Sequence, residues 1–224
     1  MILAIDIGNT NIVLGCFDDD NIILRERIST NHTATTIEYA ATIKTAFEMY
    51  GIDRKEVTGA IISSVVPAVT NTVKSAIEKF LGIDVLVIGP GIKTGLSIVI
   101  DNPSQLGSDL VVDAVAGLNE YTAPMVIIDM GTATKMMVVN RKATFIGVSI
   151  MPGAHMGLGA LIRETAQLPQ ISLATPPAAA AKNTIDSMRS GVLFGHAAMV
   201  DGMIDRICEE LSKQLPVLAT GGYA

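Results

Sequence analysis

The chain carries one short polar pattern twice, each time where an apolar run ends. The first copy is Asp6-Ile7-Gly8-Asn9-Thr10-Asn11 and the second is Asp129-Met130-Gly131-Thr132-Ala133-Thr134. In each copy a carboxylate can hold Mg²⁺ directly or through water, and the glycine lets phosphate oxygens approach the backbone. The neighbouring hydroxyl and amide groups can hydrogen-bond those oxygens. One copy alone could be a polar turn between strands, but two copies predict two duplicated lobes that grip one triphosphate.

Two other segments contain candidate functional residues that also have simpler explanations. Gly221-Gly222 follows the last apolar run, where it either turns the chain or presents bare backbone to a flat adenine ring. Gly107-Ser108-Asp109 precedes a helical pattern, so Ser108 or Asp109 could cap a helix. Asp109 could instead be a general base that takes a proton from a substrate hydroxyl during phosphoryl transfer. These residues alone leave both interpretations of Asp109 open.

The composition indicates a globular protein with a large apolar core. Of the 224 residues, 49% are hydrophobic and 17% are charged, which favours a buried subunit interface. A net charge of −6 argues against a nucleic-acid surface, which needs a basic stripe. The apolar runs are interrupted before the roughly 18 residues that a membrane-spanning helix requires. The sequence also has neither a P-loop nor a Rossmann fingerprint.

The N-terminus and the cysteines favour a cytoplasmic protein. The chain enters a strand pattern at Met1 without a basic region, so no signal peptide is expected. Cys16 and Cys208 lie far apart and have no companion cysteine. They are expected to be reduced thiols in the core.

Hydrophobic periodicity predicts an α/β chain in which one order of elements begins twice. In the first half we expect helices over 36–50, 67–81 and 110–118, and strands at 2–7, 12–17, 22–29, 60–65 and 85–88. In the second half we expect helices over 154–167 and 186–213, and strands at 125–129, 135–139, 144–150 and 216–220. Each half begins with a three-stranded meander that carries the Asp-x-Gly turn. The prediction is two lobes, residues 1–117 and 118–224, each with a mixed sheet flanked by helices.

Taken together, the motifs resemble those of type III pantothenate kinases. In chain order they are Asp6 to Asn11, Ser63-Ser64-Val65-Val66-Pro67, Gly89 to Gly95, Asp101-Asn102-Pro103, Gly107-Ser108-Asp109, Asp129 to Thr134, Pro152-Gly153, Lys182-Asn183-Thr184, Gly191 and Ala219-Thr220-Gly221-Gly222. They span essentially the whole chain. The resemblance implies the duplicated ribonuclease-H-like fold of the actin-like ATPase superfamily. It also implies the ATP-dependent conversion of pantothenate to 4′-phosphopantothenate, the first step of coenzyme A biosynthesis.

The resemblance further implies roles for individual residues. The ATP-binding residues would be Asp6, Gly8, Asn9, Thr10, Asn11, Thr132, Gly221 and Gly222, with Asp6 also holding Mg²⁺. Asp109 would be the catalytic base, and the positions matching substrate contacts are Ile100, Gly107, Ser108, Asp109, Leu110 and Thr184. Asp129 matches the ligand of a monovalent cation, K⁺ or NH₄⁺. The family forms homodimers that bring Thr184 to the subunit interface.

Several positions depart from the family pattern. Ile100 stands where the family usually has Tyr, and Leu110 where it usually has Arg, so a phenol and a five-donor cation are lost. Asp113 replaces a usual Asn. Lys135 follows the second polar motif, where it would either contact phosphate or point to solvent. These departures leave two alternatives open: a kinase of the same fold for another small alcohol, and a non-catalytic nucleotide-binding paralog that acts as a regulator.

Two histidines near these motifs are expected to be non-catalytic. His196 lies on an otherwise apolar helical pattern and is predicted to be a hydrogen-bonded core residue. His155 follows Pro152-Gly153 and is predicted to lie at the surface or at a helix end.

Overall fold

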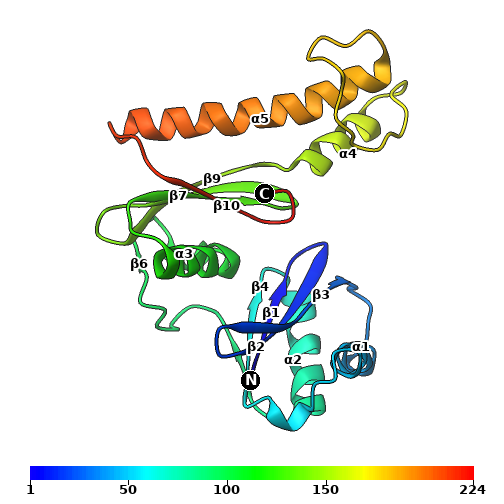
Figure 1. Cartoon of the computed structure of the whole chain (residues 1–224), viewed down its shortest axis with the longest axis vertical. Helices are drawn as coiled ribbons and strands as arrows, with labels where there is room; N and C mark the ends of the chain where they lie inside the picture. Colours follow the sequence, from blue (N-terminus) through cyan, green and yellow to red (C-terminus); the bar gives the residue numbers. More distant parts are fainter. The chain divides into compact units, whose positions relative to one another are not determined.

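A computed structural model of the chain describes all of residues 1–224, as two compact units (Figure 1). Unit 1 comprises Met1–Gly95 and Asn102–Val112, and unit 2 comprises Leu96–Asp101 and Asp113–Ala224. Helix α3 (Ser108–Glu120) therefore has residues in both units. The lobe boundary predicted after residue 117 falls within this helix.

Unit 1 contains a five-stranded mixed sheet with the strand order β3-β2-β1-β4-β5. An antiparallel meander is formed by β1 (Ile2–Ile7), β2 (Asn11–Asp18) and β3 (Asn21–Ser29). On the other side of β1, β4 (Gly59–Ser64) and then β5 (Val85–Val87) add in parallel. Alternation along β1 buries Leu3, Ile5 and Ile7 in the core, which turns Asp6 toward the opposite face of the sheet.

Two helices cover the apolar face of this sheet, and local signals set their ends. The backbone N–H of Thr35 donates to Glu38 Oε2 at 2.7 Å, at the start of α1 (Thr36–Met49). Pro67 is the first residue of α2 (Pro67–Leu81), and Gly82 ends it in a left-handed conformation. Both helices contribute to a core with β1, β2 and β4. Short 3₁₀ turns, η1 (Arg54–Glu56) and η2 (Pro103–Gln105), lie in the connections.

Unit 2 contains a second five-stranded sheet, with the strand order β10-β7-β8-β9-β6. Its meander comprises β7 (Met125–Met130), β8 (Ala133–Val139) and β9 (Thr144–Pro152). β10 (Val217–Thr220) runs parallel to β7, as β4 runs parallel to β1. The sequence missed only β6 (Ser97–Ile98), a two-residue strand beside β9 that is too short to show periodicity. The two sheets thus repeat one topology around their first strands.

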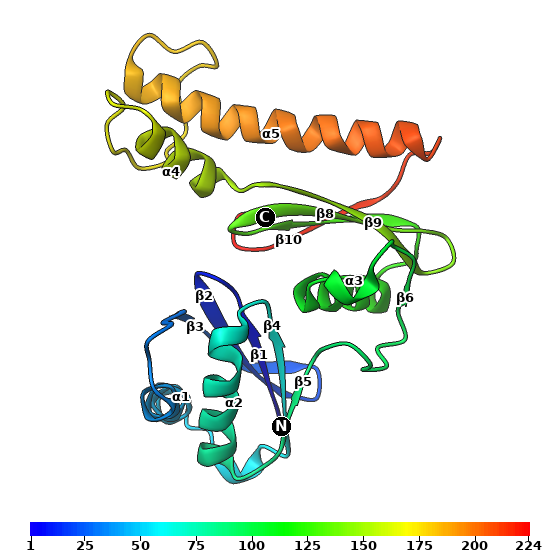
Figure 2. The ribbon, with the colours of Figure 1, turned by 180° about the vertical axis from the view of Figure 1, so that it is seen from behind.

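Helices lie on both faces of the second sheet (Figures 1 and 2). The long helix α5 (Thr184–Glu210) packs on the face that carries Val126, Ile128 and Met136. On the other face, a Cβ at Gly117 of α3 would stand 2.7 Å from Ile127 Cδ1, so this glycine permits close packing. The start of α5 also packs against α4 (Ala154–Glu164).

Helix lengths differ slightly from the sequence predictions. α4 ends at Glu164 rather than residue 167, because Thr165 is already extended. α5 begins at Thr184, where the Asn183 side chain accepts a hydrogen bond from the Asp186 N–H at 2.9 Å. No helix in the structure is long and apolar enough to cross a membrane. Cys16 and Cys208 are buried with free thiols, as expected.

Candidate functional site

The first polar motif forms the turn between β1 and β2 in unit 1. The Gly8 N–H donates to the Asn11 carbonyl at 2.9 Å, and the Gly8 carbonyl accepts from Thr30 Oγ1 at 2.6 Å. These bonds hold the turn on both sides, and they leave Asn9 and Thr10 exposed at its tip. Asp6 is exposed just before the turn. The arrangement offers a carboxylate and polar groups on a fixed backbone.

The start of α3 is anchored to the end of β4 by a serine cluster. Ser108 Oγ accepts from the Ser64 N–H and donates to the Ser64 carbonyl, both at 2.9 Å. It also lies 3.2 Å from Ser63 Oγ. Since Ser63 is the direct neighbour of Asp6 in the parallel β1–β4 pairing, their side chains share one face of the sheet. The serine cluster therefore brings the start of α3 to the face that carries Asp6.

Asp109 follows directly in the first turn of α3. Its Oδ1 accepts a hydrogen bond from the Leu110 N–H at 2.8 Å, so the carboxylate does help to satisfy the helix terminus. A Cβ at Gly107 would overlap the position of Asp109 Oδ1, so a side chain there would require this carboxylate to rotate away. The carboxylate is thus oriented by a backbone hydrogen bond, which suits either a structural or a catalytic role.

The second polar motif forms the turn between β7 and β8, pressed between two other backbone segments of unit 2. A Cβ at Gly221 would lie 2.6–2.7 Å from the backbone N, C and O atoms of Met130, and Gly221 has a φ of +101°. A Cβ at Gly153 would overlap the Thr132 carbonyl oxygen and lie 2.5 Å from that of Gly131. The Gly153 N–H also donates to the Thr132 carbonyl at 3.2 Å. Only glycine at both positions lets the three backbones meet around Thr132.

Sequence reasoning did not find this role of Gly153. The start of the helix predicted over 154–167 is correct, because Gly153 is the N-cap of α4. Its contact with the Gly131-Thr132 turn depends on tertiary packing that no local pattern reports. Gly222 lies exposed beside Gly221, next to the same turn.

Asp129 and Lys135 face each other across the base of this turn. They are direct partners in the antiparallel β7–β8 pairing, and Lys135 Nζ lies 3.0 Å from Asp129 Oδ2. The two alternatives considered for Lys135, phosphate and solvent, therefore missed its ion pair with Asp129. The carboxylate that the resemblance assigns to a monovalent cation is already in contact with an ammonium group.

His155 lies at the surface, as the sequence indicated, whereas His196 is hydrogen-bonded as expected but is half-buried rather than a core residue. Thr134 Oγ1 and His196 Nε2 are 3.0 Å apart, which joins β8 to α5 and satisfies a threonine that is 1% exposed. His155 is exposed in the first turn of α4, and its ring lies near that of Tyr223 in a tilted arrangement, with a centroid distance of 5.3 Å and an interplanar angle of 32°.

The predicted substrate positions are not brought together in one unit. Gly107, Ser108, Asp109 and Leu110 belong to unit 1, whereas Ile100 and Thr184 belong to unit 2. Leu110 is 5% exposed and packs as a core residue, which explains an apolar side chain at this position. Thr184 is exposed at the start of α5.

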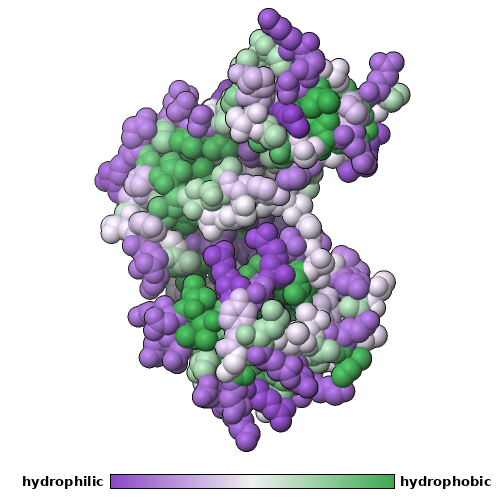
Figure 3. Space-filling view, turned by 45° about the vertical axis from the view of Figure 1, so that its right-hand side comes forward, coloured by the Kyte–Doolittle hydropathy of each residue, from purple (hydrophilic) through white to green (hydrophobic).

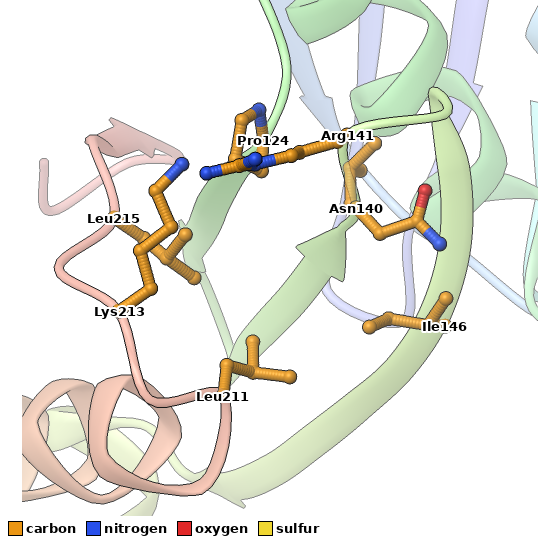
Figure 4. A pocket seen from close by; sticks show the side chains of 8 residues that line it. Pro124, Asn140, Arg141, Ile146, Leu211, Lys213 and Leu215 are labelled. Carbon is orange, nitrogen blue, oxygen red and sulfur yellow. The ribbon is translucent and has the colours of Figure 1, made fainter.

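Unit 2 also contains a shallow apolar hollow. It is lined by Leu211, Leu215 and Ile146, and the side chains of Arg141 and Lys213 extend toward Pro124 at its edge (Figure 4). It lies at the Val139 end of β8, opposite the Ala133 end that adjoins the Thr132 turn. Within unit 2 the hollow is therefore separate from the Thr132 turn.

Comparison with solved structures shows the fold. A structure of the ethanolamine utilization protein EutJ from Carboxydothermus hydrogenoformans matches with a TM-score of 0.53 and 13% identity, over 98% of this chain and 75% of that one. An activator of 2-hydroxyisocaproyl-CoA dehydratase from Clostridium difficile, with bound ADPNP, matches with a TM-score of 0.50 and 12% identity. The match covers 99% of this chain and 80% of that one. The α/β fold of the actin-like ATPase class, which the family resemblance implied, is confirmed.

Comparison with protein sequences shows the family. The family model described as type III pantothenate kinase matches residues 2–206. The type III pantothenate kinase of Exiguobacterium sp. is 44% identical over 224 residues, which cover 100% of this chain and 88% of the relative. That of Geotalea daltonii is 41% identical over the same shares of both chains. This chain belongs to the type III pantothenate kinase family.

Proposed function

We propose that this chain phosphorylates pantothenate with ATP to form 4′-phosphopantothenate, the first step of coenzyme A biosynthesis. The observation that carries the proposal is the match to type III pantothenate kinases over 100% of this chain and 88% of the relative. The serine cluster supports it, because it anchors the start of α3, where Asp109 lies, at the face of the unit 1 sheet that carries Asp6.

ATP would be held by both polar turns. Asn9, Thr10 and Asn11 offer donors to phosphate oxygens from unit 1, and Thr132 does so from unit 2. The bare backbone at Gly221 and Gly222 would face the adenine ring. Positioning of the triphosphate by these fixed groups is the main catalytic contribution that phosphoryl transfer requires.

Asp6 is suited to hold Mg²⁺. This ion usually keeps several waters and binds through one or two carboxylates plus the substrate phosphates, so one exposed carboxylate beside a phosphate-binding turn is sufficient. When bound, Mg²⁺ would neutralise negative charge on the transferring phosphate.

Asp109 would act as the general base. As the pantothenate hydroxyl oxygen forms a bond to the γ-phosphorus and the bond to ADP breaks, the hydroxyl proton passes to the Asp109 carboxylate. The Leu110 N–H keeps the carboxylate oriented, and Ser108 keeps the start of α3 on β4. Gly107 and Ser108 would line the acceptor side of the site with Ile100, while the buried Leu110 shapes the core behind it.

The chain would work as a cytoplasmic homodimer. Met156 and Leu161 of α4, with Ile185 and Phe194 of α5, are at least 40% exposed and apolar. Figure 3 shows apolar surface, in green, in the upper part of the view that contains α4 and the start of α5. Thr184 lies at the same end of α5. A second copy of the chain docked on this apolar surface would therefore bring Thr184 and its neighbours to the subunit interface.

The experiment is a coupled assay of ADP release with ATP, Mg²⁺ and pantothenate, which compares the wild type with Asp109→Asn. Loss of the base should lower kcat by about 10²- to 10⁴-fold, while the KM for ATP changes little. Asp20→Asn, in the exposed β2–β3 turn, is the matched control and should keep wild-type kinetics. Full activity of Asp109→Asn would remove this residue from the base role. A wild type that turns over another small alcohol and leaves pantothenate untouched would contradict the proposed substrate.

A further inference from the structure

The pair of Asp129 and Lys135 is fixed by the sheet itself. The β7–β8 register sets the two residues directly opposite each other, with Met130 and Thr134 as the next pair toward the turn. Direct partners in an antiparallel pair point to the same face with their Cβ atoms about 5 Å apart. The 3.0 Å contact between Lys135 Nζ and Asp129 Oδ2 therefore needs no movement of the backbone.

The pair is partly enclosed and lies beneath the second polar turn. Side-chain exposure is 20% for Lys135 and 17% for Asp129, which is far lower than that of a surface ion pair such as Lys44 and Glu48, at 61% and 65%. A Cβ at Gly131 would stand 3.5 and 3.9 Å from the two carboxylate oxygens of Asp129. The carboxylate thus lies against the glycine of the turn, and the Lys135 ammonium approaches the turn with it.

This arrangement does not fit a mobile monovalent cation on Asp129. A K⁺ ion would have to displace the ammonium group from the carboxylate, or sit beside it with the same charge. Removing one partner from an enclosed ion pair leaves an uncompensated charge, which is strongly unfavourable. Attraction to the carboxylate is already satisfied by a cation that the chain carries at a fixed position.

We propose that the Lys135 ammonium replaces the monovalent cation, so that this chain neither binds nor needs K⁺ or NH₄⁺ at Asp129. A lysine head group carries the same single charge as either ion and donates hydrogen bonds as NH₄⁺ does. Because it is tethered to β8, its occupancy does not depend on the salt around the protein. In catalysis, Lys135 would supply one fixed positive charge beneath the Thr132 turn. This role rests on the proposed kinase function.

The first test measures cation binding without any turnover. Melting temperatures are compared in KCl and in choline chloride at about 0.1 M, where ionic screening is the same. The wild type should show equal values in both salts. Lys135→Met keeps the length of the side chain but leaves Asp129 without its partner, so this variant should gain about 2–5 °C in KCl at concentrations well above its Kd for K⁺. Lys142→Met, in the exposed β8–β9 turn, is the control and should behave as the wild type does.

The second test measures turnover of ATP with pantothenate in the same salts. Wild-type kcat should change by less than about twofold between KCl and choline chloride, whereas Lys135→Met should be stimulated about tenfold or more by KCl or NH₄Cl. A wild type that is stabilised or activated specifically by K⁺ would overturn the proposal. A folded Lys135→Met variant whose melting temperature and turnover do not respond to K⁺ would also overturn the proposal. If this variant does not fold, the comparison of the wild type in the two salts decides the proposal. Should the wild type not phosphorylate pantothenate, the proposed function fails, yet the melting experiment still decides the role of Lys135.

Discussion

Gly153→Ala is a direct test of the tightly packed Thr132 turn. The φ of Gly153 is −70°, which any residue can adopt, so alanine introduces a steric conflict without backbone strain. Its Cβ would lie 2.5 Å from the Gly131 carbonyl oxygen, whereas an unstrained contact needs about 3.4 Å. Either the turn or the start of α4 must therefore retreat by about 0.9 Å.

A displacement of this size should reduce catalysis more than stability. Misplacing a substrate-positioning group by about 1 Å can cost about 100-fold in rate, whereas overpacking typically costs about 1–3 kcal/mol, or about 2–12 °C in Tm for a chain of this length. We expect kcat/KM for ATP to fall about 10- to 100-fold in the coupled assay, with a cooperative melt still observed by circular dichroism. Gly147→Ala is the control, because a Cβ at that position of β9 meets no atom within 4 Å. A folded Gly153→Ala variant with kcat/KM within about threefold of the wild type would refute the view that the packed turn positions the nucleotide.

Two further predictions concern stability. Ser108→Ala removes the hydroxyl that bonds both backbone groups of Ser64, so the free energy of unfolding should fall by about 1–3 kcal/mol, measured by urea titration; an unchanged midpoint would show that the serine cluster does not anchor α3. Burial raises the pKa of the Cys16 thiol, so stability should be fully present below the unfolded-state pKa of about 8.5 and should decline as the pH rises toward the higher folded-state pKa. Cys16→Ala should flatten this decline between about pH 8.5 and 10 in urea titrations, and an equally steep decline in the variant would assign the effect to other groups.

Most of the fold follows from local patterns in the sequence. The alternation in β1 and the apolar spacing in α2 report burial directly, and Pro67 and Gly82 set the ends of α2. The strand β6 was not predicted from the sequence, because two residues cannot show a hydrophobic period. Its place beside β9 depends on a long-range pairing. The change of unit within α3 likewise depends on tertiary packing, which the helical pattern of that segment does not reveal.

The candidate site was predicted less completely than the fold. The two polar turns and Asp109 stand out in the sequence because glycine, carboxylates and hydroxyl groups follow apolar runs. The contacts of Gly153 with the Thr132 turn and of Ser108 with β4 join residues that are distant in the chain, so no spacing could report them. The partner of Lys135 could have been found, because counting outward from a short β7–β8 turn pairs residue 135 with residue 129.

The pairing of β7 with β8 has a consequence for how this protein can change. Along β8, Thr134 and Met136 face α5, while Lys135 and Met137 face the other side. One residue inserted into the turn would exchange these two sets. The Lys135 ammonium group would then enter the apolar core under α5, and the Asp129 carboxylate would lose its counter-ion. Insertions or deletions in this hairpin should therefore be tolerated only in steps of two residues. A protein that lost Lys135 by substitution would retain its fold and would come to depend on a monovalent cation from solution.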